Sequence, residues 1–298
     1  MISDKKLFYS LLTAFFATAL VIGSFFDLEI ATAVYLPKNP PALFVTFIEL
    51  YFFHAVFVFL IGILLGQFFS SGINKNKRIL CSVICGYLAL STSVLGAGGL
   101  LSASCYGEIF GRREFSFFHF LIIGIIIFYP LFFIGFFVGK KRYDKNLIKK
   151  IIILLSVLTI SYFIPIIFKE IICRPRYRIV SSGYNGIDFT PWYSLFRESD
   201  FYQKKYSLTG DDFGSFFSGH AVIATMNFII FPIFNEIFPT IKNKTLFIIS
   251  VTMMILTVLS RMVLGAHYLS DISFGVLVGT LLCIVYHCLE KRIIKKEF

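Results

Sequence analysis

Runs of about 20 apolar residues recur along this chain from one end to the other, and they constrain its fold more than any other feature. A helix needs about 20 such residues to cross the hydrocarbon core of a bilayer. Eight runs of this kind occur, at residues 7–26, 43–70, 79–103, 116–139, 151–168, 218–238, 245–259 and 272–289. The sequence therefore predicts an all-α, polytopic transmembrane helix bundle with about eight spans.

The composition excludes a water-soluble globular domain. Charged residues make up 15% of the 298 residues and hydrophobic residues 57%, whereas soluble domains carry about 25% charged residues. A particle of this size could not bury 38 Phe and 15 Tyr in its interior. The net charge of +11 comes from short Lys and Arg clusters between the apolar runs. This distribution indicates membrane topology and does not favour a nucleic-acid partner.

Lys and Arg are divided unequally between alternate loops, and this asymmetry predicts the orientation of the chain. The segments on the side of both termini hold 17 of them, and the opposite segments hold 11, of which seven lie in the long segment 169–217. Because positive loops stay cytoplasmic, we expect cytoplasmic termini and an extracytoplasmic loop at 169–217. Segment 27–42 is too short and polar to cross, and it predicts an interfacial helix that ends at Pro37.

Three short polar segments interrupt the apolar pattern, and each adjoins the predicted outer end of a span. They are residues 169–176 (KEIICRPR), 215–220 (SFFSGH) and 260–271 (SRMVLGAHYLSD). Charged groups at such a depth are costly unless they are paired or functional. Their cations, imidazoles and carboxylate are the residue types of a phosphate site.

The cations and one predicted helix start suit a phosphoryl group. Arg presents a planar fork of donors and Lys a compact charge, so Lys169, Arg176 and Arg261 can neutralise a tetrahedral anion without a metal ion. Ser218 and Gly219 precede a long apolar run, as an N-cap does. We therefore expect a helix to begin there with its free N–H groups facing the site.

His267 and Asp271 are four residues apart, so they share one face of a helix. The carboxylate can then hold one imidazole nitrogen while the other nitrogen faces phosphorus. A histidine oriented in this way is a candidate nucleophile.

The three motifs resemble those of the type 2 phosphatidic acid phosphatases, the PAP2 superfamily, which share their site with vanadium haloperoxidases and glucose-6-phosphatase. The family pattern is K-x6-R-P, then P-S-G-H, then S-R-x5-H-x3-D. The third motif matches in full, the second reads FSGH with Phe217 in place of Pro, and the first has Tyr177 where Pro is usual. The resemblance covers residues 169–271.

The resemblance implies a role for each polar residue and no metal ion or other cofactor. His267 would attack phosphorus and form a phospho-histidine, Asp271 would orient it, and His220 would protonate the leaving oxygen. The phosphate group would be bound by Lys169, Arg176, Ser218, Gly219 and Arg261.

The register of the first motif has an alternative, because Arg174 also precedes a proline. Arg176 keeps the six-residue spacing from Lys169 and is preferred. Arg178 is expected to be a surface cation.

The resemblance also implies an organisation and an activity. Residues 1–150 would form about four N-terminal transmembrane helices, and residues 151–298 a PAP2-like catalytic core. The protein is expected to lie in a bacterial-type plasma (inner) membrane, with its active site on the extracytoplasmic face. It would hydrolyse a lipid phosphate or diphosphate, with undecaprenyl diphosphate, phosphatidylglycerophosphate, phosphatidate and lipid A as candidates. A lipid phosphotransferase with the same site, or a non-catalytic binder or transporter of anionic lipids, remains an alternative.

Two small residues in the last span, Gly275 and Gly279, are spaced for close helix packing.

Overall fold

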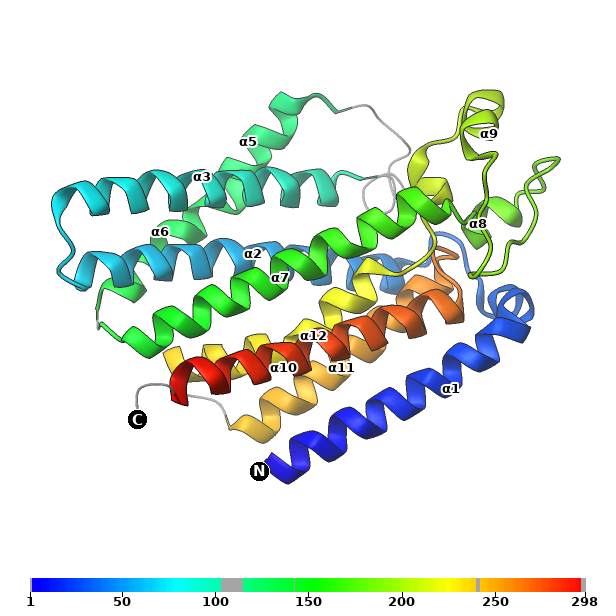
Figure 1. Cartoon of the computed structure of the whole chain (residues 1–298). Coiled ribbons are helices and arrows are strands. Elements are labelled where there is room, and N and C mark those ends of the chain that lie inside the picture. Colours follow the sequence, from blue (N-terminus) through cyan, green and yellow to red (C-terminus); the bar gives the residue numbers. More distant parts are fainter. Residues whose placement is uncertain (1, 103–114, 142, 240–241, 296–298) are drawn as a thin grey trace. The chain divides into compact units, whose positions relative to one another are not determined.

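The computed structural model of the chain describes residues 2–102, 115–141, 143–239 and 242–295. Within these residues all regular elements are helical and none is a strand, which confirms the all-α prediction (Figure 1). Eight helices in the described part are long and apolar enough to cross a membrane. They correspond one by one to the eight predicted spans.

The chain forms two compact units, which are described separately. Unit 1 consists of Met1–Thr46 and Thr159–Val285, and unit 2 of Phe47–Leu158 and Tyr286–Phe298. Unit 1 thus combines the N-terminal helix with all three polar motifs. The division at residue 150 that the resemblance implies stays a prediction.

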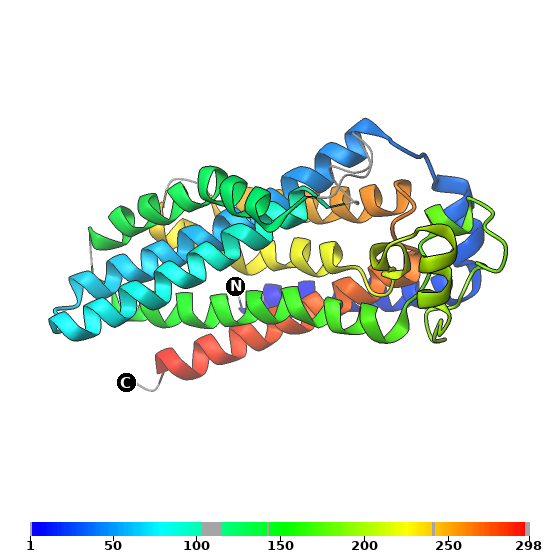
Figure 2. The ribbon, with the colours of Figure 1, turned by 90° about the horizontal axis from the view of Figure 1, so that it is seen from above.

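Five long helices form most of unit 1 (Figures 1 and 2). They are α1 (Ile2–Val34), the second part of α7 (Lys145–Ile172), α10 (Gly219–Ile237), α11 (Asn243–Val263) and most of α12 (Leu269–Lys295). Three short elements lie between α7 and α10, namely α8 (Tyr177–Val180), α9 (Ser199–Tyr206) and the 3-10 turn η1 (Gly210–Phe213). Within unit 1 these short elements lie at the end of α1 that is remote from the N-terminus (Figure 1).

Helix α12 packs closely on α10 through its two small residues. A Cβ atom added at Gly275 would lie 2.6 Å from the carbonyl oxygen of Ser218, and one at Gly279 would lie 2.7 Å from Cβ of Thr225. The predicted packing role of this glycine pair is therefore confirmed. The close approach brings the first turns of α10 and α12, and the motif residues they carry, side by side.

Helix α1 bends where the first predicted span ends. Phe26 has non-helical backbone angles, with φ −126° and ψ 16°, and the helix then continues to Val34. The predicted helix after residue 26 is therefore present, but it ends at Val34 and not at Pro37. Its first residue, Asp27, is buried inside unit 1 with 2% of its surface exposed.

Unit 2 contains most of α2 (Pro40–Ser70), α3 (Lys75–Leu100), α5 (Phe117–Ile127), α6 (Tyr129–Lys140) and the first part of α7. The span predicted at 116–139 is two helices that meet at Phe128. A proline is tolerated in the first turn of α6 because the N–H it lacks has no partner within the helix there. Gly62 of α2 faces the backbone of α6 so closely that a Cβ atom would collide with the carbonyl of Phe132.

Candidate active site

The three polar motifs meet at one end of unit 1, and backbone hydrogen bonds join the second motif to each of the others and join the third to Arg178, two residues after the first motif. The N–H of Arg178 donates to the carbonyl oxygen of Gly265 at 3.0 Å. In the same way the N–H of Ser215 donates to Arg174 and that of Ser218 to Asp271, both at 3.1 Å. Main-chain contacts therefore hold together segments that lie about 40 to 100 residues apart in the sequence.

The second motif forms the start of α10, as predicted. Ser218 is the N-cap, and its Oγ accepts a hydrogen bond from the N–H of Ala221 at 3.3 Å. Gly219 and His220 are the first two residues of the helix. N–H groups at a helix start have no acceptor in the preceding turn and carry a partial positive charge. The start of α10 therefore adds backbone donors to the site.

A cationic group formed by Lys169, Arg176 and Arg261 lies around His267, since each of them acts electrostatically on that imidazole. Arg176 and Arg261 are each 1% exposed. The guanidinium of Arg261 donates to Oγ1 of Thr46 at 3.3 Å. These three residues are the predicted phosphate ligands, and the fold brings them together.

Asp211 is the internal counter-ion of this cationic group. Its carboxylate accepts from Arg176 at 2.5 Å and from Arg178 at 3.0 Å. Desolvation acts to raise the pKa of Asp211, but the two guanidinium groups and Lys169 together hold it well below its usual range. The carboxylate therefore stays ionised. Asp211 could not be predicted from the sequence, because nothing local distinguishes it from other loop acids.

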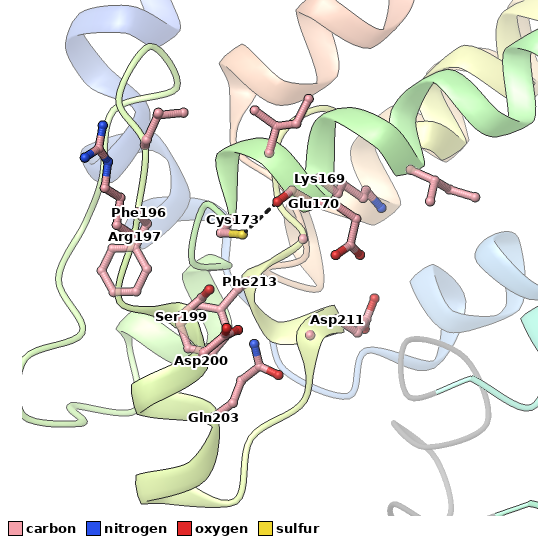
Figure 3. Close-up of a pocket in the computed structure, with 15 residues that line it drawn as sticks. Lys169, Glu170, Cys173, Phe196, Arg197, Ser199, Asp200, Gln203, Asp211 and Phe213 are labelled. Atoms are coloured by element: carbon pink, nitrogen blue, oxygen red, sulfur yellow. Dashed lines mark hydrogen bonds between the residues drawn. The ribbon is translucent and has the colours of Figure 1, made fainter.

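A pocket of about 720 Å³ adjoins the cationic group (Figure 3). Lys169 and Asp211 line it together with polar side chains from the segment around α9. The pocket is also lined by Ile166 and Ile171 of α7, which are 40% and 60% exposed. The pocket thus connects charged residues of the site to an exposed apolar face of α7. Among the residues that the structure describes, no group of three or more His, Cys, Asp and Glu side chains could hold a metal ion.

His267 is buried, with 1% of its surface exposed, and its ring has a defined orientation. Its Nδ1 lies 2.6 Å from the carbonyl oxygen of Ser215. Because a carbonyl can only accept, Nδ1 must carry the proton, and Nε2 keeps its lone pair. Within the described residues Nε2 has no hydrogen-bond partner.

Burial is the main cause that lowers the pKa of His267 to about 3. Asp271 opposes this shift, and the positive charges of the cationic group add to it. The imidazole is therefore neutral at physiological pH, as a nucleophile must be.

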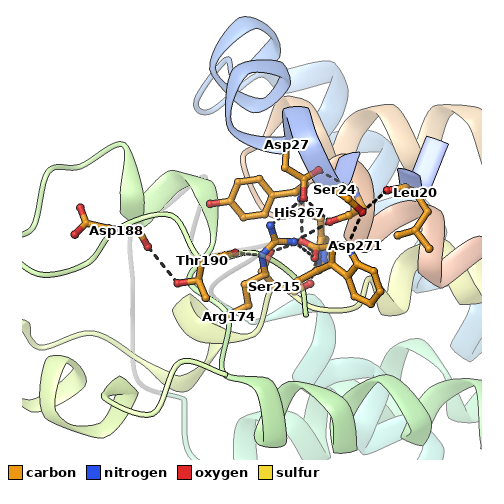
Figure 4. A network of polar contacts seen from close by, with 12 residues as sticks. Leu20, Ser24, Asp27, Arg174, Asp188, Thr190, Ser215, His267 and Asp271 are labelled. Carbon is orange, nitrogen blue, oxygen red and sulfur yellow. Dashed lines mark hydrogen bonds and ion pairs between the residues drawn. The ribbon is translucent and has the colours of Figure 1, made fainter. Parts of the chain in front are cut away.

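Asp271 contacts His267 less directly than the sequence predicts. The closest approach, from Asp271 Oδ2 to His267 Nδ1, is 3.9 Å. The carboxylate instead accepts from Oγ of Ser215 at 2.5 Å and from the N–H of Tyr268 at 2.9 Å (Figure 4). Ser215 thus bridges the two residues, since its hydroxyl binds Asp271 and its carbonyl binds His267. No role was predicted for Ser215 from the sequence.

The two arginines of the first motif have different partners. Arg174 is fully buried and donates to Asp271 at 2.5 Å and to Asp27 at 2.9 Å. Its guanidinium also lies over the ring of Tyr268, 4.1 Å from the centroid. Arg176 belongs to the cationic group. This arrangement agrees with the preference for Arg176 as the phosphate ligand.

Arg178 is not the surface cation that was expected. It is 8% exposed and donates to Asp211 and Asp212. Its position in the short helix α8 turns the side chain toward these carboxylates, and the ion pairs offset the cost of burying its charge.

His220 lies within electrostatic range of His267 and of the cationic group. The two predicted catalytic histidines therefore share one site. His220 lies in the first turn of α10, and His267 lies in the connection between α11 and α12.

Comparison with known proteins gives one match. Residues 150–295 match the family model of the PAP2 superfamily. No curated protein and no solved structure gave a match. The matched segment contains all three motifs.

Proposed function

Because residues 150–295 match the family model of the PAP2 superfamily and the described part of the chain has eight helices of spanning length, we propose that this protein is an integral membrane phosphatase for a lipid phosphate or diphosphate. The observation that carries the proposal is the oriented, neutral His267, with its open Nε2 beside a cationic group. An anion binder or transporter needs the cations but no oriented nucleophile.

In the proposed reaction, Nε2 of His267 attacks phosphorus, and a P–N bond forms while the bond from phosphorus to the lipid oxygen breaks. His220 gives a proton to the leaving oxygen. Water then attacks the phospho-histidine and passes a proton back to His220, which releases inorganic phosphate and restores Nε2. The phosphoryl oxygens are stabilised by the positive charges of Lys169, Arg176 and Arg261, and by hydrogen-bond donors of Ser218 and Gly219 at the start of α10. Asp271 orients the nucleophile, with Ser215 as the bridge.

The pocket supports a lipid as the substrate. A phosphate group at Lys169 has direct access to the exposed apolar face of α7 at Ile166 and Ile171. A lipid tail along this face would stay in contact with the membrane while the head group enters the pocket. Undecaprenyl diphosphate, phosphatidylglycerophosphate, phosphatidate and lipid A all have this form.

Phosphate release by the purified protein from a panel of these four lipids tests the proposed function. We expect inorganic phosphate and the dephosphorylated lipid from at least one of them. Transfer of the phosphoryl group to an added hydroxyl acceptor, with no inorganic phosphate, would favour a phosphotransferase. Binding of the lipids with no turnover of any would favour the binder or transporter.

Turnover is expected to be independent of divalent metal ions. Three cationic side chains and a helix N-terminus already supply the charge stabilisation that Mg²⁺ provides in kinases. The measurement is the rate of phosphate release with EDTA and after Mg²⁺ is added back. A complete loss in EDTA that Mg²⁺ restores would contradict the mechanism.

The active site is proposed to face away from the cytoplasm of a bacterial-type inner membrane, with both termini inside. Single cysteines at Asn76 and Ser207, both exposed, report the two faces when the native cysteines are replaced. An impermeant thiol reagent applied to intact spheroplasts is expected to label position 207 and not position 76. Labelling at position 76 alone would indicate the opposite topology. Labelling of both positions after lysis is the control.

A further inference from the structure

One carboxylate of the site comes from the N-terminal helix. Asp27 lies on α1 directly after the kink at Phe26 and is 2% exposed. Helix α1 lies outside the segment that matches the family model. A charge inside an apolar helix is costly unless it has partners, so the partners of Asp27 indicate why it is there.

Among the described residues, the hydrogen-bond partners of Asp27 belong to the first and third motifs (Figure 4). Oδ2 accepts from the guanidinium of Arg174 at 2.9 Å and from the hydroxyl of Ser270. Oδ1 accepts from the backbone N–H of Ser270 at 2.9 Å. Ser270 is in the first turn of α12, where an N–H has no acceptor in its own helix. Asp27 therefore holds the turn that carries Asp271.

The neighbouring residues of α1 are shaped for this contact. A Cβ atom at Gly23 would lie 2.7 Å from the nitrogen of Ser270, so only glycine permits the approach. One residue later, Ser24 accepts a hydrogen bond from the indole N–H of Trp192 at 2.9 Å. Thus α1 docks on the site along one face, and Asp27 is the charged residue of that face.

A continuous chain of short polar contacts leads from Asp27 to the imidazole. Asp27 binds Arg174, Arg174 binds Asp271, Asp271 binds Ser215, and the carbonyl of Ser215 binds His267. The four distances are 2.9, 2.5, 2.5 and 2.6 Å. Arg174 is fully buried between two carboxylates. Its position, and with it the position of Asp271, depends on both of them.

We propose that Asp27 is a positioning residue of the active site, and that α1 thereby completes a site whose proposed catalytic and phosphate-binding residues all lie in the segment that matches the family model. The inference rests on the proposed phosphatase function. Asp27 does not touch the phosphate ligands Lys169, Arg176 and Arg261, so it acts on the geometry of His267 and not on substrate binding.

Asp27→Asn is the test, because it keeps the size of the side chain and removes the negative charge that forms an ion pair with Arg174. We expect kcat to fall on the order of 10²-fold, since a small displacement of a catalytic group has this effect. KM for the lipid and the inhibition constant of inorganic phosphate should both stay within about twofold, as expected when ground-state binding is untouched. The rate at which phospho-enzyme forms should fall in parallel with kcat.

Two control variants separate this role from simple helix docking. Glu29→Gln makes the same charge change on the same helix at an exposed residue, and no effect is expected. Ser24→Ala removes the bond to Trp192 on the docked face but touches neither Arg174 nor Asp271. It should lower the unfolding temperature without a specific loss of kcat.

The outcomes distinguish the inference from the function on which it rests. If the wild-type protein hydrolyses none of the lipid phosphates, the proposed function is wrong. The inference about Asp27 is wrong if the wild type is active and Asp27→Asn has the same kcat as the wild type. It is also wrong if Ser24→Ala lowers kcat as much as Asp27→Asn does. Should Asp27→Asn not be recovered as folded protein, Asp27→Glu replaces it, because it keeps the charge but moves the carboxylate by one methylene from the position that binds Arg174 and the N–H of Ser270. Unchanged kcat in Asp27→Glu would again overturn the inference.

Discussion

Replacing His267 by alanine is expected to abolish both turnover and the covalent intermediate. Loss of a nucleophile reduces kcat by on the order of 10⁶-fold in other covalent enzymes. No other imidazole among the described residues is held by the carbonyl of Ser215, so no neighbour can take over this geometry. The buried cationic group is left intact, and binding of inorganic phosphate should therefore persist.

The measurement is transfer of a radiolabelled phosphoryl group from the lipid to the protein under rapid acid-free denaturation. A P–N bond to histidine is stable in base and labile in acid, which identifies the labelled residue type. His119→Ala is the matched control, because His119 is an exposed imidazole of unit 2 and both label and turnover should survive its removal. A trappable phospho-enzyme in His267→Ala would assign the nucleophile to another residue.

Replacing His220 by alanine is expected to affect substrates according to their leaving groups. A general acid contributes about 10² to 10⁴-fold when the leaving oxygen needs a proton. A lipid alkoxide needs one, whereas nitrophenolate leaves without protonation. The loss in kcat should therefore lie in that range for the lipid phosphate and be only a few-fold for nitrophenyl phosphate.

The two substrates are compared on the same preparation of the variant, so that a folding defect would lower both rates equally. Phospho-enzyme should still form from nitrophenyl phosphate in His220→Ala. An equal loss on both substrates with an unchanged unfolding temperature would demote His220 from the acid to a binding residue. A larger loss on the aryl substrate would contradict the assignment outright.

The spans and the helix start at Ser218 were predictable because their causes are local. A run of about 20 apolar residues is sufficient for a membrane helix, whatever it packs against. An N-cap depends on a hydroxyl and on the N–H groups of the next residues. The predicted end of the first span at residue 26 coincides with the bend of α1 at Phe26, because polar residues follow it at once.

The arginines in and directly after the first motif show what local sequence patterns cannot predict. Arg174, Arg176 and Arg178 alternate along five residues, and no local pattern distinguishes the partners that each of them has in the folded chain. Their environments differ because Arg174 meets carboxylates of α1 and α12, while Arg178 meets Asp211 and Asp212. Spacing favoured Arg176 as a ligand, but it could not show that Arg178 is buried.

The helical spacing of His267 and Asp271 predicted a direct contact that the structure replaces with a bridge. The α12 helix begins at Leu269, so His267 lies outside it and the rule for residues four apart does not apply. Ser215 fills the resulting gap from another segment. Only the folded chain reveals this, since Ser215 is 52 residues away from His267.

The sequence by itself determined the all-helical membrane architecture, the three motifs and the residue types of a phosphate site, because hydropathy and motif spacing are properties of contiguous residues. The tertiary structure alone decided which buried charge pairs with which. Asp27 and Arg174 are 147 residues apart, and their contact depends on the packing of α1 against α12. A buried charge is stable only beside its partner, and partners drawn from distant helices leave no pattern in the sequence around either residue.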